Sequence, residues 1–218
     1  MQHPSPFSSL AQEYDQWFEL HPDLFAAELA CLQGLIPPFE TAVEVGVGTG
    51  RFAQALGIPL GLDLETAMLT LAHNRGITCH QSAAEQLPWR AEHFDLVLMV
   101  TLLCFVANPA LVLAEANRVL RPHGHLLLAF LNPESQAGEA LQAGATQSPF
   151  YQKAKFLFPQ EVLQLLTQAG FNWVKANHCL KGNAAEPGFL QVQTGLGPGL
   201  FTAVLATKFP DPPRTAIG

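Results

Sequence analysis

The stretch that most constrains this chain is 41–52, with the sequence Thr-Ala-Val-Glu-Val-Gly-Val-Gly-Thr-Gly-Arg-Phe. It opens with alternating valines, which are typical of a strand, and turns through Gly46, Gly48 and Gly50 into the helical pattern of 52–56. Glycines at this spacing let a ligand approach the backbone, because no Cβ is in the way. The free N–H groups at the start of the following helix favour a negatively charged or hydrogen-bond-accepting group.

The spacing of these glycines bears on which ligand the turn holds. The dinucleotide fingerprint is G-x-G-x-x-G, whereas this chain has G-x-G-x-G and places Arg51 where the third glycine of the fingerprint would stand. Glu44 precedes the first glycine by two residues; its carboxylate would repel a pyrophosphate and suits a ligand that carries an ammonium group. A three-glycine turn is equally compatible with a purely structural strand-to-helix connection, so both interpretations stay open.

Composition narrows the class of protein. The length of 218 residues fits one domain, expected over 1–209, and 49% hydrophobic against 13% charged residues allows a large core. The net charge of −7, without a Lys/Arg cluster, argues against nucleic-acid and membrane partners. The longest apolar run, 96–107, is too short to span a bilayer, and no signal peptide is visible, so we expect a cytoplasmic protein. The four cysteines form no C-x-x-C pair, and no metal site is expected.

Apolar residues at helical spacing predict an N-terminal helical region over 7–34, with Pro22 opening its second helix and Gly34 ending it. Tyr14 and Trp17 in this region have two interpretations. They pack in the core, or they belong to a lid helix whose aromatic side chains cover a ligand. A proline-containing tail over 210–218 is expected to be poorly ordered.

Beyond the glycine turn, predicted strands and helices alternate. The expected strands are 58–64, 77–80, 94–100, 126–131, 171–179 and 200–208, and the expected helices are 52–56, 65–74, 109–120 and 159–169. The alternation predicts an α/β fold with a doubly wound, mostly parallel sheet and helices on both faces. The last two strands have no helix between them and should pair antiparallel at one edge. Segments 132–155 and 180–199 read as irregular and are the best candidates for substrate-side insertions.

Ligands of such sheets bind beyond the carboxyl ends of the strands, where the strand order reverses. The glycine turn, Asp63, the 82–88 loop and Thr101 all fall at that edge of the predicted sheet. An acid at the position of Asp63 can accept hydrogen bonds from both hydroxyls of a ribose. It can also cap the helix predicted over 65–74, and the two roles are compatible.

With these motifs in order, the chain resembles class I S-adenosylmethionine-dependent methyltransferases of the small-molecule, methyltransferase type 11-like branch. The resemblance covers about 40–175 and rests on segments 43–50, 62–69, 84–88, 94–98, 115–124 and 158–171. It implies a seven-stranded, Rossmann-like fold with an antiparallel edge strand and N-terminal lid helices. It also implies methyl transfer from S-adenosylmethionine to a small-molecule acceptor, with S-adenosylhomocysteine as the product.

The resemblance further implies a set of cofactor-binding residues. The turn would hold the methionine part with Glu44 near its ammonium group, and Asp63 would bind the ribose. The full set is Tyr14, Glu44, Gly46, Gly48, Thr49, Gly50, Asp63, Leu64, Met68, Ala84, Glu85, Val100 and Thr101. One position departs from the family pattern: Ala83 stands where many relatives place an acid that bonds the adenine amino group.

Catalytic residues remain unassigned at this point. A methyl group on a sulfonium is already activated, so a general base is needed only if the acceptor must lose a proton. Cys104 reads as a small buried residue, and His123 and His125 fall at the wrong end of the predicted sheet. A flat or hydrophobic acceptor would suit a site lined by the aromatic residues Phe105, Phe130, Phe150, Tyr151 and Phe156.

Two other functions compete with methyl transfer. A non-catalytic module that binds the cofactor or a protein partner would keep the same fold, and Ala83 together with the lack of an obvious base motivates it. A nicotinamide-dependent oxidoreductase is disfavoured by Arg51, which interrupts the dinucleotide fingerprint, and by the lack of a second catalytic domain.

Overall fold

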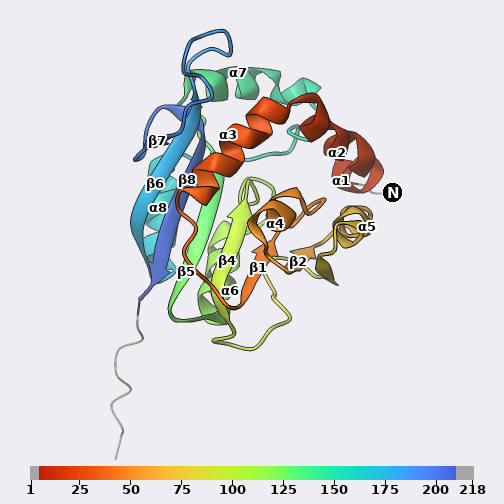
Figure 1. Cartoon of the computed structure of the whole chain (residues 1–218), viewed down its shortest axis with the longest axis vertical. Helices are drawn as coiled ribbons and strands as arrows, with labels where there is room; N and C mark the ends of the chain where they lie inside the picture. Colours follow the sequence, from red (N-terminus) through yellow and green to blue (C-terminus); the bar gives the residue numbers. More distant parts are fainter. Residues whose placement is uncertain (1–4, 210–218) are drawn as a thin grey trace, which may run out of the picture.

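The computed structural model describes residues 5–209, and these fold around one sheet of eight strands (Figure 1). The strand order is β3-β2-β1-β4-β5-β8-β6-β7. The strands are β1 Ala42–Val45, β2 Leu60–Asp63, β3 Thr78–Gln81, β4 Phe94–Val100, β5 Leu120–Leu131, β6 Phe171–Lys181, β7 Gln193–Thr194 and β8 Gly199–Lys208. The tail expected over 210–218 lies outside the described residues.

Helices precede the sheet and connect most of its parallel strands, as the alternating pattern predicts, whereas β3 and β4 are joined by the loop 82–93. They are α1 Pro6–Ser9, α2 Ala11–Leu20, α3 Pro22–Gln33, α4 Arg51–Leu56, α5 Thr66–Asn74, α6 Pro109–Val119, α7 Gln136–Gly144, the short 3₁₀ helix η1 Ala145–Gln147, and α8 Pro159–Gln168. None of the helices within residues 5–209 combines the length and apolar character needed to cross a membrane.

The strand order reverses at β1. This strand pairs in parallel with β2 on one side, where Val43 lies opposite Leu60, and with β4 on the other, where Val43 lies opposite Val97. Strands β3 and β5 extend the parallel part of the sheet in the two directions. The carboxyl ends of β1, β2 and β4 therefore meet at one edge, beside the crevice that a reversal of strand order creates.

The antiparallel pairing expected for the last two strands is confirmed, and it has an additional partner. Strand β8 pairs antiparallel with β6, and also with β5, so it is inserted between them. Its residues are almost all buried, as a strand with neighbours on both sides requires. The segment 180–199, expected to be loop, contributes the short strand β7, which pairs with β6 at Asn177 and His178.

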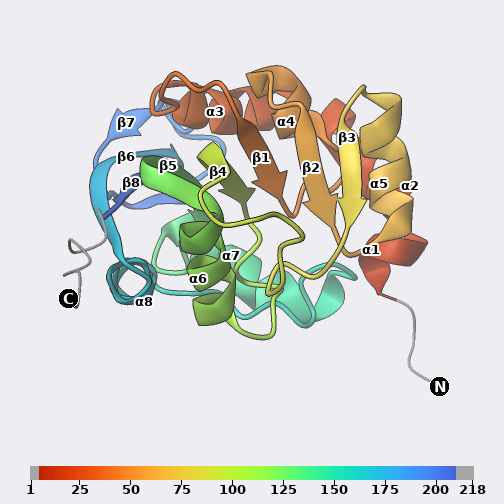
Figure 2. The same cartoon turned by 90° about the horizontal axis from the view of Figure 1, so that it is seen from below.

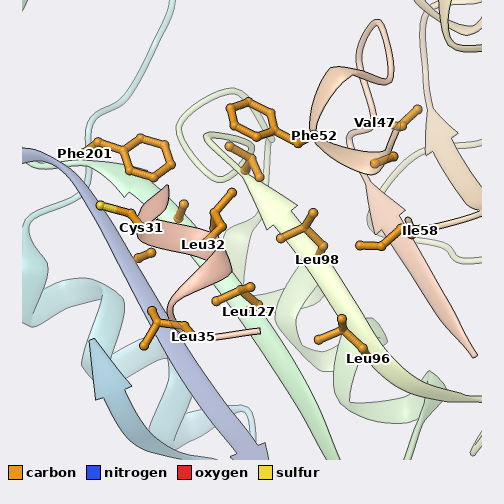
Figure 3. Close-up of a cluster of buried hydrophobic side chains, with 14 of the residues drawn as sticks. Cys31, Leu32, Leu35, Val47, Phe52, Ile58, Leu96, Leu98, Leu127 and Phe201 are labelled. Carbon is orange, nitrogen blue, oxygen red and sulfur yellow. The ribbon is translucent and has the colours of Figure 1, made fainter. Parts of the chain in front are cut away.

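Each face of the sheet carries its own core. Leu96 and Leu98 of β4 pack in a cluster with α3 and α4, whereas Val97 and Met99 pack in a second cluster with α6 and α8. Figure 2 shows these two helical layers on opposite sides of the sheet, and Figure 3 shows part of the first cluster. This arrangement explains the continuous apolar run of β4, because a strand covered on both faces has no solvent side.

The segment 132–155 was expected to be irregular, and this is wrong for its first half, which forms α7 and η1. The Ser135 hydroxyl begins α7 by accepting a hydrogen bond of 2.9 Å from the Gly138 N–H. Two glycines within the nine residues of α7, Gly138 and Gly144, hide its helical pattern, since glycine is a poor helix former.

Candidate active site

The glycine turn after β1 adopts a backbone conformation that side chains disfavour. Gly46, Gly48 and Gly50 have φ angles of 74°, 51° and 83°. A Cβ on Gly46 would lie 2.7 Å from Leu102 Cδ1, and one on Gly50 would lie 3.0 Å from Ala72 Cα. A Cβ on Gly48 would come no nearer than 3.9 Å to its neighbours. Packing against the α5 backbone therefore requires glycine at Gly50, Gly46 approaches only the end of the Leu102 side chain, and Gly48 borders open space.

That space is a cleft of about 940 Å³ at the carboxyl edge of the sheet. Its volume lies in the upper part of the range of about 300–1,000 Å³ typical of small-molecule sites. The glycine turn, the ends of β2 and β4, the 82–85 loop, the N-terminal helices and segment 147–153 all line it. The expected cofactor residues that line it are Tyr14, Gly46, Gly48, Asp63, Leu64, Met68, Ala84, Glu85, Val100 and Thr101.

A second, small cavity of about 30 Å³ adjoins the turn and is lined by Tyr14, Glu44 and Thr49, among others. Glu44 is 1% exposed, and its Oε2 has no hydrogen-bond partner within the described part of the chain. Burial raises the pKa of Glu44 well above its usual range, although the Ala53 N–H donates to its carboxylate. The cavity has room for one small polar group beside this carboxylate.

Asp63 ends β2 and is held by the backbone on both oxygens. Its Oδ2 accepts a hydrogen bond of 2.9 Å from the Gly48 N–H, and its Oδ1 accepts one of 3.0 Å from the Glu65 N–H. Burial nevertheless raises its pKa above the ordinary value. The alternative that Asp63 is the cap residue of α5 is wrong, because Glu65 occupies that position.

The remaining residues that were expected to bind the cofactor differ in where they lie relative to the two cavities. Gly50 lines neither cavity, because it packs against α5. Glu85 is oriented by Ala107 and Asn108, whose N–H groups donate to its Oε1 at 3.2 and 3.4 Å. Thr101 follows β4 with a φ of 50°, a strained conformation for a β-branched residue.

Two further residues considered from the sequence lie near this edge. Ala83 does line the cleft, so the position of the missing acid faces it with a methyl group. Cys104 is buried, and burial raises the pKa of its thiol to about 12. The thiol therefore stays protonated at neutral pH and does not serve as a base.

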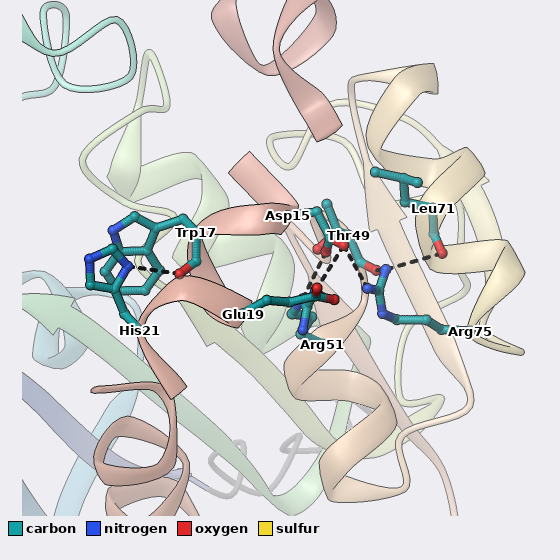
Figure 4. Close-up of polar contacts among 8 residues, drawn as sticks. All are labelled: Asp15, Trp17, Glu19, His21, Thr49, Arg51, Leu71 and Arg75. Carbon is teal, nitrogen blue, oxygen red and sulfur yellow. Dashed lines mark hydrogen bonds and ion pairs between the residues drawn. The ribbon is translucent and has the colours of Figure 1, made fainter. Parts of the chain in front are cut away.

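An ionic network that the sequence reasoning missed ties α2 to the glycine turn (Figure 4). The Asp15 carboxylate pairs with Arg51 at 2.8 Å and with Arg75 at 2.7 Å, and Arg75 also donates to the Thr49 carbonyl at 2.9 Å. Burial opposes ionisation of Asp15, but hydrogen bonds from Arg51, Thr49 and Arg75 lower its pKa to about 2. The sequence feature that could have indicated this network is the acid pair Asp15 and Glu19, which are four residues apart and share one helical face.

The two aromatic residues of α2 have different surroundings. Tyr14 lines both the main cleft and the small cavity beside Glu44. Trp17 is 37% exposed and stacks on His21, with ring centroids 4.7 Å apart. Only Tyr14 therefore lies where a residue covering a ligand would lie.

The other half of the cleft is aromatic. Phe7 meets Phe105 with ring centroids 4.9 Å apart, and Tyr14 meets Phe150 at 5.4 Å. Phe105 and Phe150 were expected on the acceptor side and do line the cleft. Tyr151 was expected there too; it stacks on Phe105 but does not line the cleft itself.

Two other aromatic residues were expected on the acceptor side. Phe156 lies beside Tyr151, with ring centroids 5.8 Å apart. Phe130 was expected there and is not: strand alternation turns it into the cluster packed on α6 and α8, away from its neighbour Ala129.

Comparisons with known proteins agree with this geometry. A family model described as a methyltransferase domain matches residues 43–128. A solved Thermotoga maritima structure, described as a SAM-dependent methyltransferase and possible histamine N-methyltransferase, superposes with a TM-score of 0.87. It is 35% identical, over 93% of this chain and 98% of that one.

Two curated relatives complete these comparisons. An uncharacterized protein of Methanocaldococcus jannaschii is 34% identical over 93% of this chain and 98% of its own length. An uncharacterized protein of Mycobacterium tuberculosis is 38% identical, and the match spans 78% of this chain and 60% of that protein. By family model, fold and sequence identity, the chain belongs to the S-adenosylmethionine-dependent methyltransferases.

Proposed function

We propose that this chain transfers a methyl group from S-adenosylmethionine to a small-molecule acceptor by in-line displacement. The observation that carries the proposal is the placement of two acids, Glu44 and Asp63, at the tips of neighbouring strands on either side of the glycine turn. The unpartnered Oε2 of Glu44 fits a ligand ammonium group, and the open space at Gly48 fits a ligand close to the backbone.

The residues that would hold the cofactor follow from these contacts. Glu44 and Thr49 would bind the amino-acid part beside the small cavity, and Asp63 would accept from the ribose hydroxyls. Leu64, Met68 and Ala84 would pack on the adenine, and Val100 and Thr101 would border the methionine chain. When bound, S-adenosylmethionine supplies a methyl group on a positively charged sulfur.

The chain itself then has to position the acceptor and exclude water. Tyr14 lines both the small cavity and the main cleft, so α2 would cover the site as a lid. Holding two reactants in line lowers the activation free energy by up to about 7–11 kcal/mol in favourable systems, so positioning can supply much of the rate enhancement. The acids Asp63, Glu65 and Glu85 at the cleft, against the single cation Lys153 among its described lining residues, support an acceptor other than a nucleic acid.

Calorimetry with S-adenosylhomocysteine tests the cofactor site. We expect the wild type to bind, Asp63→Ala to bind at least about tenfold more weakly through loss of hydrogen bonds to a charged group, and Asp23→Asn, an exposed acid on α3, to bind like the wild type. Absence of binding at millimolar ligand, or an unchanged affinity of Asp63→Ala, would contradict the proposal.

Transfer of a labelled methyl group to a panel of small acceptors tests the reaction. Histamine belongs in the panel because the Thermotoga maritima relative is described as a possible histamine N-methyltransferase. Binding of S-adenosylhomocysteine without transfer to any acceptor would instead support the alternative of a non-catalytic module on the same fold.

A further inference from the structure

Arg51, which interrupts the dinucleotide fingerprint after the glycine turn, is a charged residue that the proposed cofactor contacts do not use. It begins α4, and its side chain is only 15% exposed. Its Nε and Nη2 each donate to one oxygen of Asp15 at 2.8 Å, and Nη2 also donates to Glu19 at 3.0 Å. The third nitrogen, Nη1, has no hydrogen-bond partner within residues 5–209 and is not fully buried. One nitrogen of the guanidinium therefore remains to donate to a ligand.

The side chain of Arg51 borders the small cavity that also contains Glu44. Among the described residues that line this cavity, these two are the charged ones, and the remainder are backbone of the glycine turn, aromatic rings and small or apolar side chains. The small cavity and the main cleft share the lining residues Tyr14, Gly46, Gly48, Val100 and Thr101. They are neighbouring parts of one site, so a ligand in the cleft can extend an end group toward both Glu44 and Arg51.

The opposite charges of Glu44 and Arg51 match the end of an α-amino acid. Its ammonium and carboxylate groups are attached to one carbon, so a ligand whose ammonium group meets Glu44 brings its carboxylate to the wall of the same cavity. A guanidinium suits a carboxylate because its N–H donors form a planar fork. The hydrogen bond with Asp15 raises the pKa of Arg51 further, which keeps the guanidinium charged. A ligand that carried an ammonium group alone would need only the acid.

We propose that Arg51 binds the carboxylate group of the cofactor's amino-acid part, while Glu44 meets its ammonium group, and that Asp15 of α2 holds the guanidinium in place. Arg51 is then a binding residue and Asp15 a positioning residue. This assignment rests on the proposed function, since it completes the cofactor site of the same cleft.

The same contact joins the bound ligand to the helix that covers it. Asp15 follows Tyr14 on α2, and the Tyr14 ring lies over the glycine turn, where a Cβ on Gly48 would come within 3.9 Å of its Cε1. Figure 4 shows Asp15 between two arginines, Arg51 and Arg75. Both pair with Asp15, but only Arg51 lines a cavity. Arg75 is therefore the matched control for an effect that acts through the fold alone.

Calorimetry with three nucleosides separates the groups of the ligand. They are S-adenosylhomocysteine, its decarboxylated analogue, which keeps the amino group, and 5′-methylthioadenosine, which lacks the whole amino-acid part. We expect the wild type to bind S-adenosylhomocysteine about 10–100-fold more tightly than the decarboxylated analogue, because the analogue lacks a charge-assisted contact. Arg51→Gln should remove most of this preference, while its affinity for 5′-methylthioadenosine stays at the wild-type value.

The preference for the carboxylate should follow the position of the guanidinium in three further variants. Arg51→Lys should keep part of it, because the charge remains and the planar fork is lost. Asp15→Asn should reduce it, because Arg51 loses the anionic partner that orients it. Arg75→Gln should leave it near the wild-type value, even where the affinities for both ligands fall together. Each preference compares two ligands on one variant, so a general loss of stability cancels.

Equal affinity of the wild type for S-adenosylhomocysteine and its decarboxylated analogue would overturn the assignment of Arg51, and so would an unchanged preference in Arg51→Gln. A preference that falls as far in Arg75→Gln as in Arg51→Gln would also overturn it, because the network would then act through the fold. If the wild type binds none of the three nucleosides, the proposed function itself is refuted.

Discussion

The cleft has two halves, a glycine-turn side and an aromatic helical side; the acid Asp63 at the first and the buried acid Glu28 on α3 are held in opposite ways. On the glycine-turn side, Asp63 receives a backbone N–H on each oxygen, from Gly48 and Glu65. On α3, Glu28 receives none from the described chain, and burial alone acts on its pKa. The first acid is fixed by the backbone. The second has no such partner in the described chain, and its raised pKa keeps it mostly protonated at neutral pH.

The halves also differ in how the chain builds them. The glycine-turn side is formed largely within residues 44–68, by backbone conformation. The helical side is assembled by side chains that are distant in sequence, from Phe7 to Phe150. A change in the turn should therefore disturb the fold itself, and a change on the helical side should disturb mainly the ligand.

The largest effect is expected for Gly50→Ala. The new Cβ would lie 3.0 Å from Ala72 Cα at a φ of 83°, so conformational strain and overpacking should lower the free energy of unfolding by about 2–4 kcal/mol. Urea unfolding measures this. Gly48→Ala is the matched control: its Cβ faces the cleft, so it should lower stability less and weaken binding of S-adenosylhomocysteine more. Equal losses of stability in the two variants would contradict the distinction between Gly50, which packs against α5, and Gly48, which borders the cleft.

Glu28→Gln should change how stability depends on pH. The folded pKa of Glu28, about 8, is raised above the unfolded value of 4.5, so the folded state holds an extra proton between these values. Its ionisation therefore destabilises the wild type progressively from about pH 5 to pH 8, by on the order of 3–4 kcal/mol. Unfolding measured at pH 5 and pH 9 should show a smaller decline for Glu28→Gln. Parallel curves for the two proteins would show that Glu28 is not a buried, unpartnered acid.

Asp15→Asn tests the connection between the halves, since Asp15 links α2 to Arg51 and Arg75. We expect the free energy of unfolding to fall by about 1–2 kcal/mol at pH 7, because the partly buried ion pairs of Asp15 are broken. The folded pKa of Asp15, about 2, is below the unfolded value of 3.8, so its contribution is complete above pH 4 and disappears as the pH falls toward 2. Urea unfolding of the two proteins at pH 7 and at pH 2 measures this difference. Glu19→Gln, whose side chain is 69% exposed, should cost little, and an equal loss there would contradict the assignment.

The smallest effect is expected for Phe105→Leu. Loss of its contacts with Phe7 and Tyr151 should weaken binding of the acceptor by about 0.5–1.5 kcal/mol, while the affinity for S-adenosylhomocysteine stays the same. Calorimetry with an acceptor from the transfer assay measures this, and Phe158→Leu, at an exposed position, provides the control. A variant that loses cofactor affinity instead would show that the two halves are not separable.

The features that could be predicted from the sequence lie mainly on the glycine-turn side of the cleft. The strands, the helices and the glycine turn are encoded by local patterns, such as the apolar run of β4 and the glycines after β1, and the fold class is confirmed. The insertion of β8 between β5 and β6 was not predicted, because connection lengths do not specify which edge a returning strand joins.

The ionic network of Asp15 and the residues of the N-terminal helices could not be predicted in the same way. Asp15 meets Arg75 across sixty positions of sequence, and nothing local indicates that pairing. Glu28 did carry a signal, since it interrupts the apolar stripe that includes Cys31 and Leu32 on α3. An acid at such a position is uncommon unless it is paired or used.

The place of β8 has a consequence for the order in which the chain can reach this architecture. Strands β5 and β6 are made before β8, yet neither touches the other, and both wait for the strand that fills the gap. Until Gly199–Lys208 has been synthesised, the growing polypeptide therefore carries two open hydrogen-bonding edges, and α3, which packs on β6 and β8, lacks one of these two strands. Residues that lie far from the cleft thus complete the surface on which α3 packs.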